Sequence, residues 1–142
     1  MTKIELLEAD LERDEGRRSK PYRCTSGKLT IGVGRNLDDV GLYEDEIDLL
    51  LHNDIKRVIA DLLTFPWFMG LDSVRKRATA NLRFQLGPGG FRAFNKGPTS
   101  TLAALAAGDY DTAASRLLKN KIARQTPERM ARIAQMWRTG EA

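Results

Sequence analysis

Three residues combine type and spacing in a way that suggests chemistry: Glu15, Cys24 and Thr30. They offer a carboxylic acid, a thiol and a hydroxyl within one short stretch. Proteins use such groups as a general acid, as a nucleophile or base, and as a hydrogen-bond partner for water. The residues between 15 and 35 leave a helix, cross a turn and enter a glycine-spaced strand pair. The rest of the chain is interpreted as the scaffold that holds these three groups and as the surface along which a substrate would bind.

Glu15 closes an amphipathic helix predicted over residues 3–15. It follows Leu11 by four residues and Ile4 by eleven, so at about 100° per residue it falls on the apolar face. Burial and the negative end of the helix dipole both favour the protonated carboxyl that a general acid needs. The alternative is a helix-end glutamate that extends into solvent and pairs with Arg17 or Arg18.

Cys24 and Thr30 each allow more than one interpretation. A thiol acts as a nucleophile, as a base once ionised, or as a small buried apolar group. The only histidine, His52, lies inside a predicted long helix, which disfavours a Cys–His pair. Thr30 suits a strand. Its hydroxyl either holds a water or a sugar hydroxyl, or is simply solvated.

The composition indicates one globular domain of 142 residues. A net charge of +4 favours a polyanionic partner, such as nucleic acid, anionic lipid or wall polymer, or serves solubility alone. One cysteine excludes an intramolecular disulfide. Because the chain has only one cysteine and one histidine, a zinc site is not expected. The sequence also contains no dinucleotide-binding loop and no P-loop. We therefore expect neither a metal nor a cofactor.

Capping and breaker residues predict a mostly helical α+β protein. A small antiparallel hairpin or sheet is expected around a turn at 25–27, followed by a loop at 36–41. The longest helix is predicted over 43–63. A later helix is expected to be capped by Ser73 and to end at Gly87. Further helices are expected from Thr99 or Ser100 to Gly108, over 110–120, and from Thr126–Pro127 onward.

The Glu–Cys–Thr spacing resembles the catalytic triad of the phage-type lysozymes (endolysins), in which the middle residue is Asp or Cys. The flanking segments Asp-Glu-Gly, Lys-Pro-Tyr and Leu-Thr-Ile-Gly-Val-Gly are also similar to that family. The similarity covers nearly the whole chain in order. It continues through Asn81-Leu-Arg-Phe-Gln85-Leu-Gly, Leu105-Ala-Ala-Gly-Asp-Tyr-Asp, Arg124-Gln-Thr-Pro-Glu-Arg129 and Arg138-Thr-Gly.

The resemblance implies a two-lobed lysozyme-like fold that acts as one catalytic domain. The N-terminal lobe with its sheet would cover about 14–42, the connecting helix about 43–63, and the helical C-terminal lobe about 64–142. Helix 3–15 would pack onto that C-terminal lobe.

The implied reaction is hydrolysis of the β-1,4 bond between N-acetylmuramic acid and N-acetylglucosamine in peptidoglycan. Glu15 would be the general acid, and Cys24 and Thr30 would orient or activate the attacking water, with inversion at the anomeric carbon. If Cys24 were a nucleophile, retention would follow. The implied substrate-binding residues are Tyr22, Gly34, Arg35, Phe84, Gln85 and Arg129.

Two positions depart from the family pattern. Arg35 stands where some relatives carry histidine, and it is expected to pair with an acid of the long helix, with Asp54 as the candidate. Such a pair would respond less to neutral pH than one made by histidine. Ile122 stands where many relatives carry tryptophan, and is interpreted as a core substitution.

Two other functions stay open at this point. A lytic transglycosylase also uses a glutamate but forms an anhydro ring without water. A non-catalytic wall or membrane binder would use the basic C-terminal segment. For the enzyme, we expect a monomer without nucleic acid as partner and with weak contact to anionic membrane or wall polymers. It would stay in the host cytoplasm, without a signal peptide, until a separate holin releases it to the periplasm or cell wall.

Overall fold

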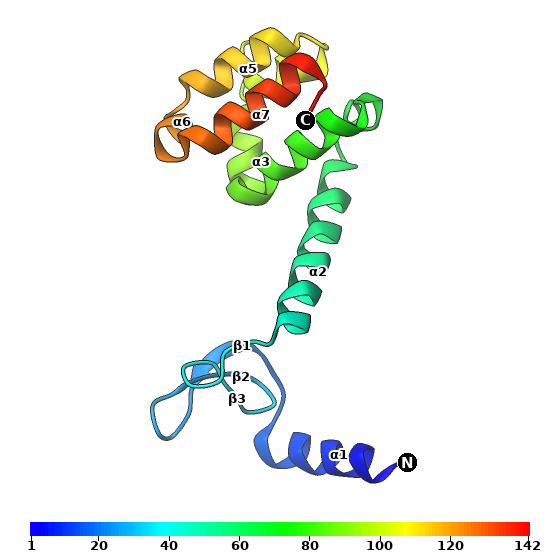
Figure 1. Ribbon diagram of the computed structural model, residues 1–142, viewed down its shortest axis with the longest axis vertical. Coiled ribbons are helices and arrows are strands. Elements are labelled where there is room, and N and C mark those ends of the chain that lie inside the picture. The colour runs from blue at the N-terminus through cyan, green and yellow to red at the C-terminus, as the bar shows by residue number, and fades with distance from the viewer. The chain divides into compact units, whose positions relative to one another are not determined.

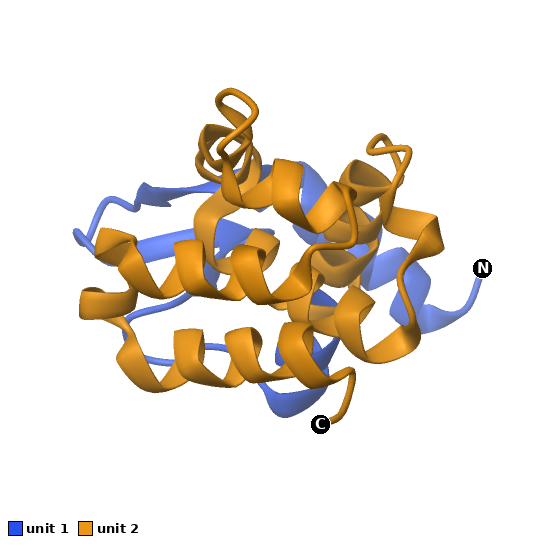
Figure 2. Cartoon of the chain, turned by 90° about the horizontal axis from the view of Figure 1, so that it is seen from above, with its two compact units in different colours: residues 1–50 blue, residues 51–142 orange.

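A computed structural model describes residues 1–142 and divides into two compact units, Met1–Leu50 and Leu51–Ala142 (Figure 2). Unit 1 contains a first helix, a small sheet and the first turns of the long helix, and unit 2 is entirely helical (Figure 1). The predicted class, mostly helical α+β, is confirmed. The boundary between the units falls inside the long helix, and the expected packing of helix 3–15 onto the second lobe stays a prediction.

Helix α1 spans Lys3–Glu15, as predicted. Thr2 and Glu5 form a reciprocal capping box, in which the Thr2 hydroxyl accepts from the Glu5 amide and the Glu5 carboxylate accepts from the Thr2 amide. Gly16 follows the last helical turn and donates its amide to the Glu12 carbonyl. The helix therefore delivers Glu15 at its last position.

The sheet of unit 1 has three antiparallel strands in the order β1–β2–β3. They are Arg18–Arg23, Leu29–Gly32 and Arg35–Asn36. The hairpin and its turn are confirmed. The short β3 was not predicted, and Asn36, which had been assigned to a loop, belongs to it. Tyr22 lies opposite Thr30 in the β1–β2 register.

Helix α2 spans Glu44–Leu62, within one residue of the prediction at each end. Its first turn contains Glu44, Asp45 and Glu46, where negative charge suits the helix dipole. Only Val58 and Leu62 of this helix are buried. A 3-10 turn, η1 at Phe68–Gly70, follows and buries Phe68.

The core lies in unit 2. Its helices are α3 at Ser73–Arg92, α4 at Thr101–Ala106, α5 at Tyr110–Lys119, α6 at Lys121–Gln125 and α7 at Pro127–Thr139, with a 3-10 turn η2 at Ala93–Asn95. The fully buried large side chains come from α2, α3, α4, α5 and α7, and include Trp137, Phe91, Leu82, Leu117 and Met130. The buried face of α7 consists of Met130, Ile133, Ala134 and Trp137.

Three details of the helical prediction were wrong or missed. Asp72, not Ser73, caps α3, because its carboxylate accepts the Arg75 amide at 2.9 Å. Gly87 interrupts the helix as predicted, with φ of +72°, but helical structure resumes and reaches Arg92. The short α6 was not predicted, although Asn120 caps it through its side chain.

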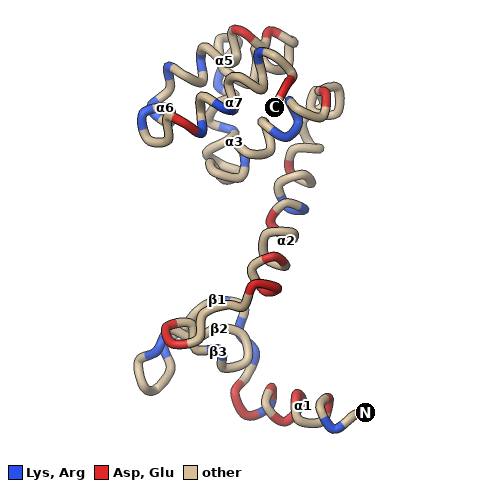
Figure 3. The backbone as a smooth tube through the Cα atoms, viewed as in Figure 1, with Lys and Arg blue, Asp and Glu red and all other residues tan.

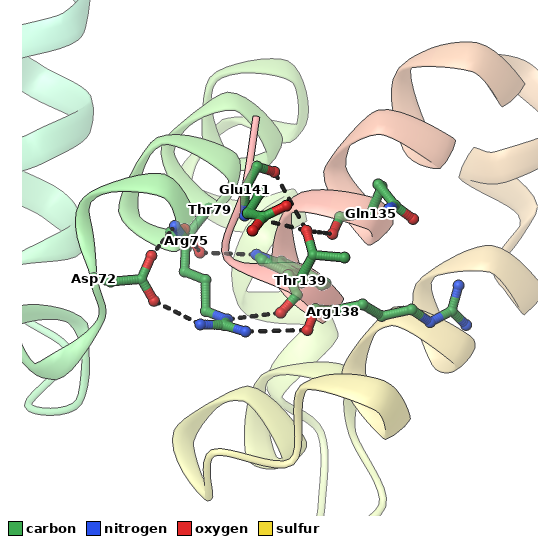
Figure 4. A network of polar contacts seen from close by, with 8 residues as sticks. Asp72, Arg75, Thr79, Gln135, Arg138, Thr139 and Glu141 are labelled. Carbon is green, nitrogen blue, oxygen red and sulfur yellow. Dashed lines mark hydrogen bonds and ion pairs between the residues drawn. The ribbon is translucent and has the colours of Figure 1, made fainter.

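Arg75 joins the start of α3 to the end of α7 (Figure 4). Its guanidinium donates to the carbonyls of Trp137 (2.6 Å) and Arg138 (3.1 Å), and it pairs with Asp72 at 2.7 Å. The Trp137 indole N–H in turn donates to the Thr79 hydroxyl at 3.1 Å. These bonds satisfy carbonyls that the end of a helix leaves without partners.

A second polar network holds α2 to α3. The Asp61 carboxylate accepts from Arg83 Nε at 2.5 Å and from Arg92 Nη2 at 2.6 Å. The hydrogen bonds from Arg92, and then those from Arg83, lower the pKa of Asp61 to about 2. Neither arginine was singled out from the sequence. No helix in the structure combines the length and apolar character needed to cross a bilayer.

Candidate active site

The predicted catalytic residues all lie in unit 1, at the junction of α1 and the sheet. Glu15 ends α1, Cys24 follows β1, and Thr30 lies inside β2. Thr30 is buried, with 4% of its surface exposed, whereas Cys24 is partly exposed. The sheet thus fixes the hydroxyl firmly and leaves the thiol within reach of solvent.

Glu15 lies against the turn between β2 and β3. A Cβ built on Gly34 would stand 3.1 Å from Glu15 Oε2 and 3.3 Å from its Cδ, so only glycine leaves normal space for this carboxyl group. The expected burial of Glu15 is not seen, because no residue of α1 is buried. Its carboxyl group lies beside Gly34, where a larger residue would contact it.

The β1–β2 turn brings Cys24 and Thr30 to one backbone carbonyl. The Cys24 amide donates to the Lys28 carbonyl at 3.0 Å, and the Thr30 hydroxyl donates to the same oxygen at 2.9 Å. The Gly27 amide closes the turn on the Cys24 carbonyl at 2.8 Å. Since the Thr30 proton is used in this bond, its oxygen keeps its lone pairs as acceptors.

The Cys24 thiol is surrounded by hydrogen-bond donors. Ser26 Oγ lies 3.1 Å from Cys24 Sγ. This hydroxyl is the largest cause that lowers the pKa of Cys24, followed by the backbone of Lys28 and of Ser26. Together they bring the pKa to about 7. A substantial fraction of the sulfur is therefore ionised at neutral pH.

Arg35 forms a two-pronged ion pair with Glu46, at 2.5 and 2.6 Å, and also donates to the Gly41 carbonyl. An acid of the long helix was predicted as its partner, but the choice of Asp54 was wrong, because Asp54 pairs with Arg57. Glu46 is at the start of α2, close to β3. The pair lowers the pKa of Glu46 to about 2.

Tyr22 lies under the guanidinium of Arg18, which stands 4.2 Å from its ring centre. The cation stacks on the face of the ring. Tyr22 is also the β1 partner of Thr30, so the sheet holds it close to the predicted catalytic group. Its role toward substrate stays a prediction.

Two of the three predicted substrate residues of unit 2 line an apolar groove of about 840 Å³. Phe84 and Arg129 line it, and Phe84 is 43% exposed. Gln85 is instead turned toward Thr126, to whose hydroxyl its amide donates at 3.0 Å, while its buried Oε1 has no partner. Arg129 is held by Asn81 through Nε at 2.7 Å.

Sequence reasoning did not single out Ser26 or Lys28, which contact the predicted catalytic residues. For Ser26 a signal was available. A hydroxyl residue two positions after Cys24, inside a predicted turn, is placed to bond back to it. For Lys28 the contacting group is a backbone carbonyl, which has no signature in the sequence.

Charge is distributed unevenly along the chain (Figure 3). Acidic residues outnumber basic ones in unit 1, particularly on α1 and in the first turn of α2, whereas basic residues outnumber acidic ones in unit 2. A basic helical unit suits contact with an anionic polymer.

Comparison with known proteins gave a consistent result. The family model described as phage lysozyme matches residues 12–133. An endolysin of Acyrthosiphon pisum secondary endosymbiont phage 1 is 32% identical over 114 residues, covering 77% of this chain and 73% of that protein. The pre-baseplate central spike protein Gp5 of Enterobacteria phage T4 is 26% identical, over 92% of this chain but 27% of that longer protein.

Proposed function

The chain belongs to the phage lysozyme family of glycoside hydrolases, and on that premise we propose that it cuts the β-1,4 bond between N-acetylmuramic acid and N-acetylglucosamine. Family membership implies peptidoglycan hydrolysis. The observation that carries the finer assignment is the hydrogen-bonded group of Cys24, Thr30 and the Lys28 carbonyl, in the same unit as Glu15.

We assign Glu15 as the general acid. Its carboxyl group is accessible at the end of α1, and Gly34 gives it a side-chain-free surface to lie against. A general acid must reach the leaving oxygen of the substrate, so accessibility on one side and support on the other both serve it. Protonation of that oxygen makes the departing sugar a neutral alcohol.

Thr30 and Cys24 orient and activate the attacking water. The Thr30 hydroxyl donates its proton to the Lys28 carbonyl, so toward a water its oxygen acts only as an acceptor. One hydrogen of the water therefore points at Thr30 Oγ1. The ionised Cys24 sulfur accepts the other hydrogen. A water held in this way has a lone pair free to point at the anomeric carbon.

In the proposed step, the water oxygen forms a bond to the anomeric carbon as the glycosidic bond breaks. One water proton passes to Cys24 Sγ, while the Glu15 proton passes to the leaving oxygen. The enzyme is left with a thiol and a carboxylate, and solvent exchange restores both. Because water attacks directly on the face opposite the leaving group, the product configuration is inverted.

The proposal extends to binding and to biology. Tyr22, Gly34 and Arg35 from unit 1, and Phe84, Gln85 and Arg129 from unit 2, are proposed to contact the polysaccharide. The protein acts as a monomer on the host wall, reaches it from the cytoplasm through a separate holin, and makes weak contact with anionic wall polymer or membrane through its basic unit.

Proton NMR of the first turnover of a defined muropeptide oligomer tests this mechanism. We expect the newly formed reducing end to appear in the α configuration before mutarotation. A Cys24→Ser variant should lose most activity, because a serine hydroxyl does not ionise near neutral pH, while Cys24→Asp should retain a measurable part. A β product would contradict direct attack by water and indicate a covalent intermediate.

A further inference from the structure

Ser26 is placed to act on the thiol without touching substrate. It occupies the turn between β1 and β2, two residues after Cys24, and its Oγ lies 3.1 Å from Cys24 Sγ. An ionised sulfur only accepts hydrogen bonds, so the Ser26 hydroxyl is the donor in that state. The Gly27 amide and the Cys24 amide both hold the turn closed, which fixes the backbone from which the two side chains extend.

We propose that Ser26 is a positioning residue for hydrolysis, whose hydroxyl holds Cys24 Sγ in place as an acceptor for the attacking water's proton. This inference rests on the proposed function. Ser26 donates from the turn side, while the Thr30 hydroxyl is engaged with Lys28. The sulfur thus has a fixed donor on one side and keeps other lone pairs for the water.

The charged groups around the turn do not replace this contact. They form two acid–base pairs, Arg23 with Asp38 at 3.7 Å and Lys28 with Asp39 at 3.0 Å. Each pair is largely self-neutralising, which limits its net effect on Cys24. The neighbouring hydroxyl is accordingly the largest cause of the lowered pKa of the thiol.

The chain offers a clean measurement because Cys24 is its only cysteine. The pH dependence of iodoacetamide alkylation on the full-length folded protein reports this thiol without background. The midpoint is the right quantity, because the intrinsic reactivity of a thiolate rises with its pKa and partly offsets a smaller ionised fraction. Peptidoglycan hydrolysis is measured over the same pH range.

We expect a wild-type midpoint near 7 and a rise of about one pH unit in Ser26→Ala, from the loss of one charge-assisted hydrogen bond. Ser26→Thr should restore most of the wild-type midpoint. Thr25→Ala is the matched control, because it removes a hydroxyl from the adjacent turn position and should leave the midpoint unchanged. The ascending limb of the pH–activity profile should move with the alkylation midpoint.

Two results would overturn the inference: an unchanged midpoint in Ser26→Ala, or an equal shift in Thr25→Ala, which would indicate general loosening of the turn. A shifted midpoint with an unmoved pH–activity profile has a different meaning. It would leave the Ser26–Cys24 contact standing and refute Cys24 as the proton acceptor in the proposed function.

Discussion

Replacing Gly34 with alanine changes the surface against which the proposed general acid lies. Gly34 has φ of +69°, and an added Cβ would stand 3.1 Å from Glu15 Oε2. Two costs follow. An L-residue in this backbone region costs about 1–2 kcal/mol of folding free energy. The carboxyl group must also move by several tenths of an ångström, because normal contacts begin at about 3.4 Å.

The second cost falls on activity. A displacement of about 1 Å near reacting groups can cost about 100-fold in rate, so a shift of about 0.3 Å, scaled in proportion, should cost about four-fold. We expect Gly34→Ala to lower kcat/KM by about that factor at a temperature where the variant is fully folded. The assay is clearance of a peptidoglycan suspension, with urea unfolding to measure stability.

Gly32→Ala is the matched control. Gly32 ends β2, directly before the same turn, with φ of +70°, yet a Cβ there would have no atom within 4 Å. It should lose the same 1–2 kcal/mol, roughly, from backbone strain and keep most of its activity. Our reasoning is that Gly34 matters for activity because it leaves space for the Glu15 carboxyl group, and not because of backbone strain. Equal activity in the two variants would refute it.

Three further predictions concern stability. Arg75→Met should lower the free energy of unfolding by about 2 kcal/mol, because two carbonyls at the end of α7 lose their donor. Urea unfolding followed by tryptophan fluorescence measures this loss, and an unchanged unfolding midpoint would contradict the prediction. The pKa of Asp61 is lowered to about 2, so the stability it contributes is complete above about pH 4 and is lost as pH falls toward 2. Asp61→Asn should therefore be less stable than the wild type at pH 6, and its stability should decline less steeply in acid. Glu46, whose pKa is also lowered to about 2, accounts for part of the decline that remains. Arg35→His should make stability fall as pH rises from 6 to 8, because a histidine beside Glu46 stabilises only while protonated; thermal melts that stay as flat as those of the wild type would count against the pair.

Local signals predicted the elements well, because each depends on neighbours in the chain. The capping box of Thr2 and Glu5, and the aspartate cap of α5 at Asp109, define helix starts regardless of tertiary structure. Ser73 shows the limit of such signals, since two adjacent residues both suit a cap. Asp72 was selected because Arg75 engages it through both its amide and its guanidinium.

The partners of charged side chains were less predictable. Arg35 was expected to bind an acid of the long helix, but sequence spacing cannot decide between Glu46 and Asp54 without knowing how β3 meets α2. The contact between Glu15 and Gly34 likewise depends on how the sheet folds back on the end of α1. The resemblance predicted a set of site residues, which stays a prediction, but it gave no information about the contacts that support them.

The central claim, hydrolysis that depends on Glu15, is tested most directly by mass spectrometry of the products from purified peptidoglycan. Wild type and Glu15→Gln are compared after both are shown to be folded by circular dichroism. The account predicts soluble fragments with reducing muramic-acid ends from the wild type and almost none from the variant. Anhydro-muramic ends from the wild type, or equal release by Glu15→Gln, would contradict it.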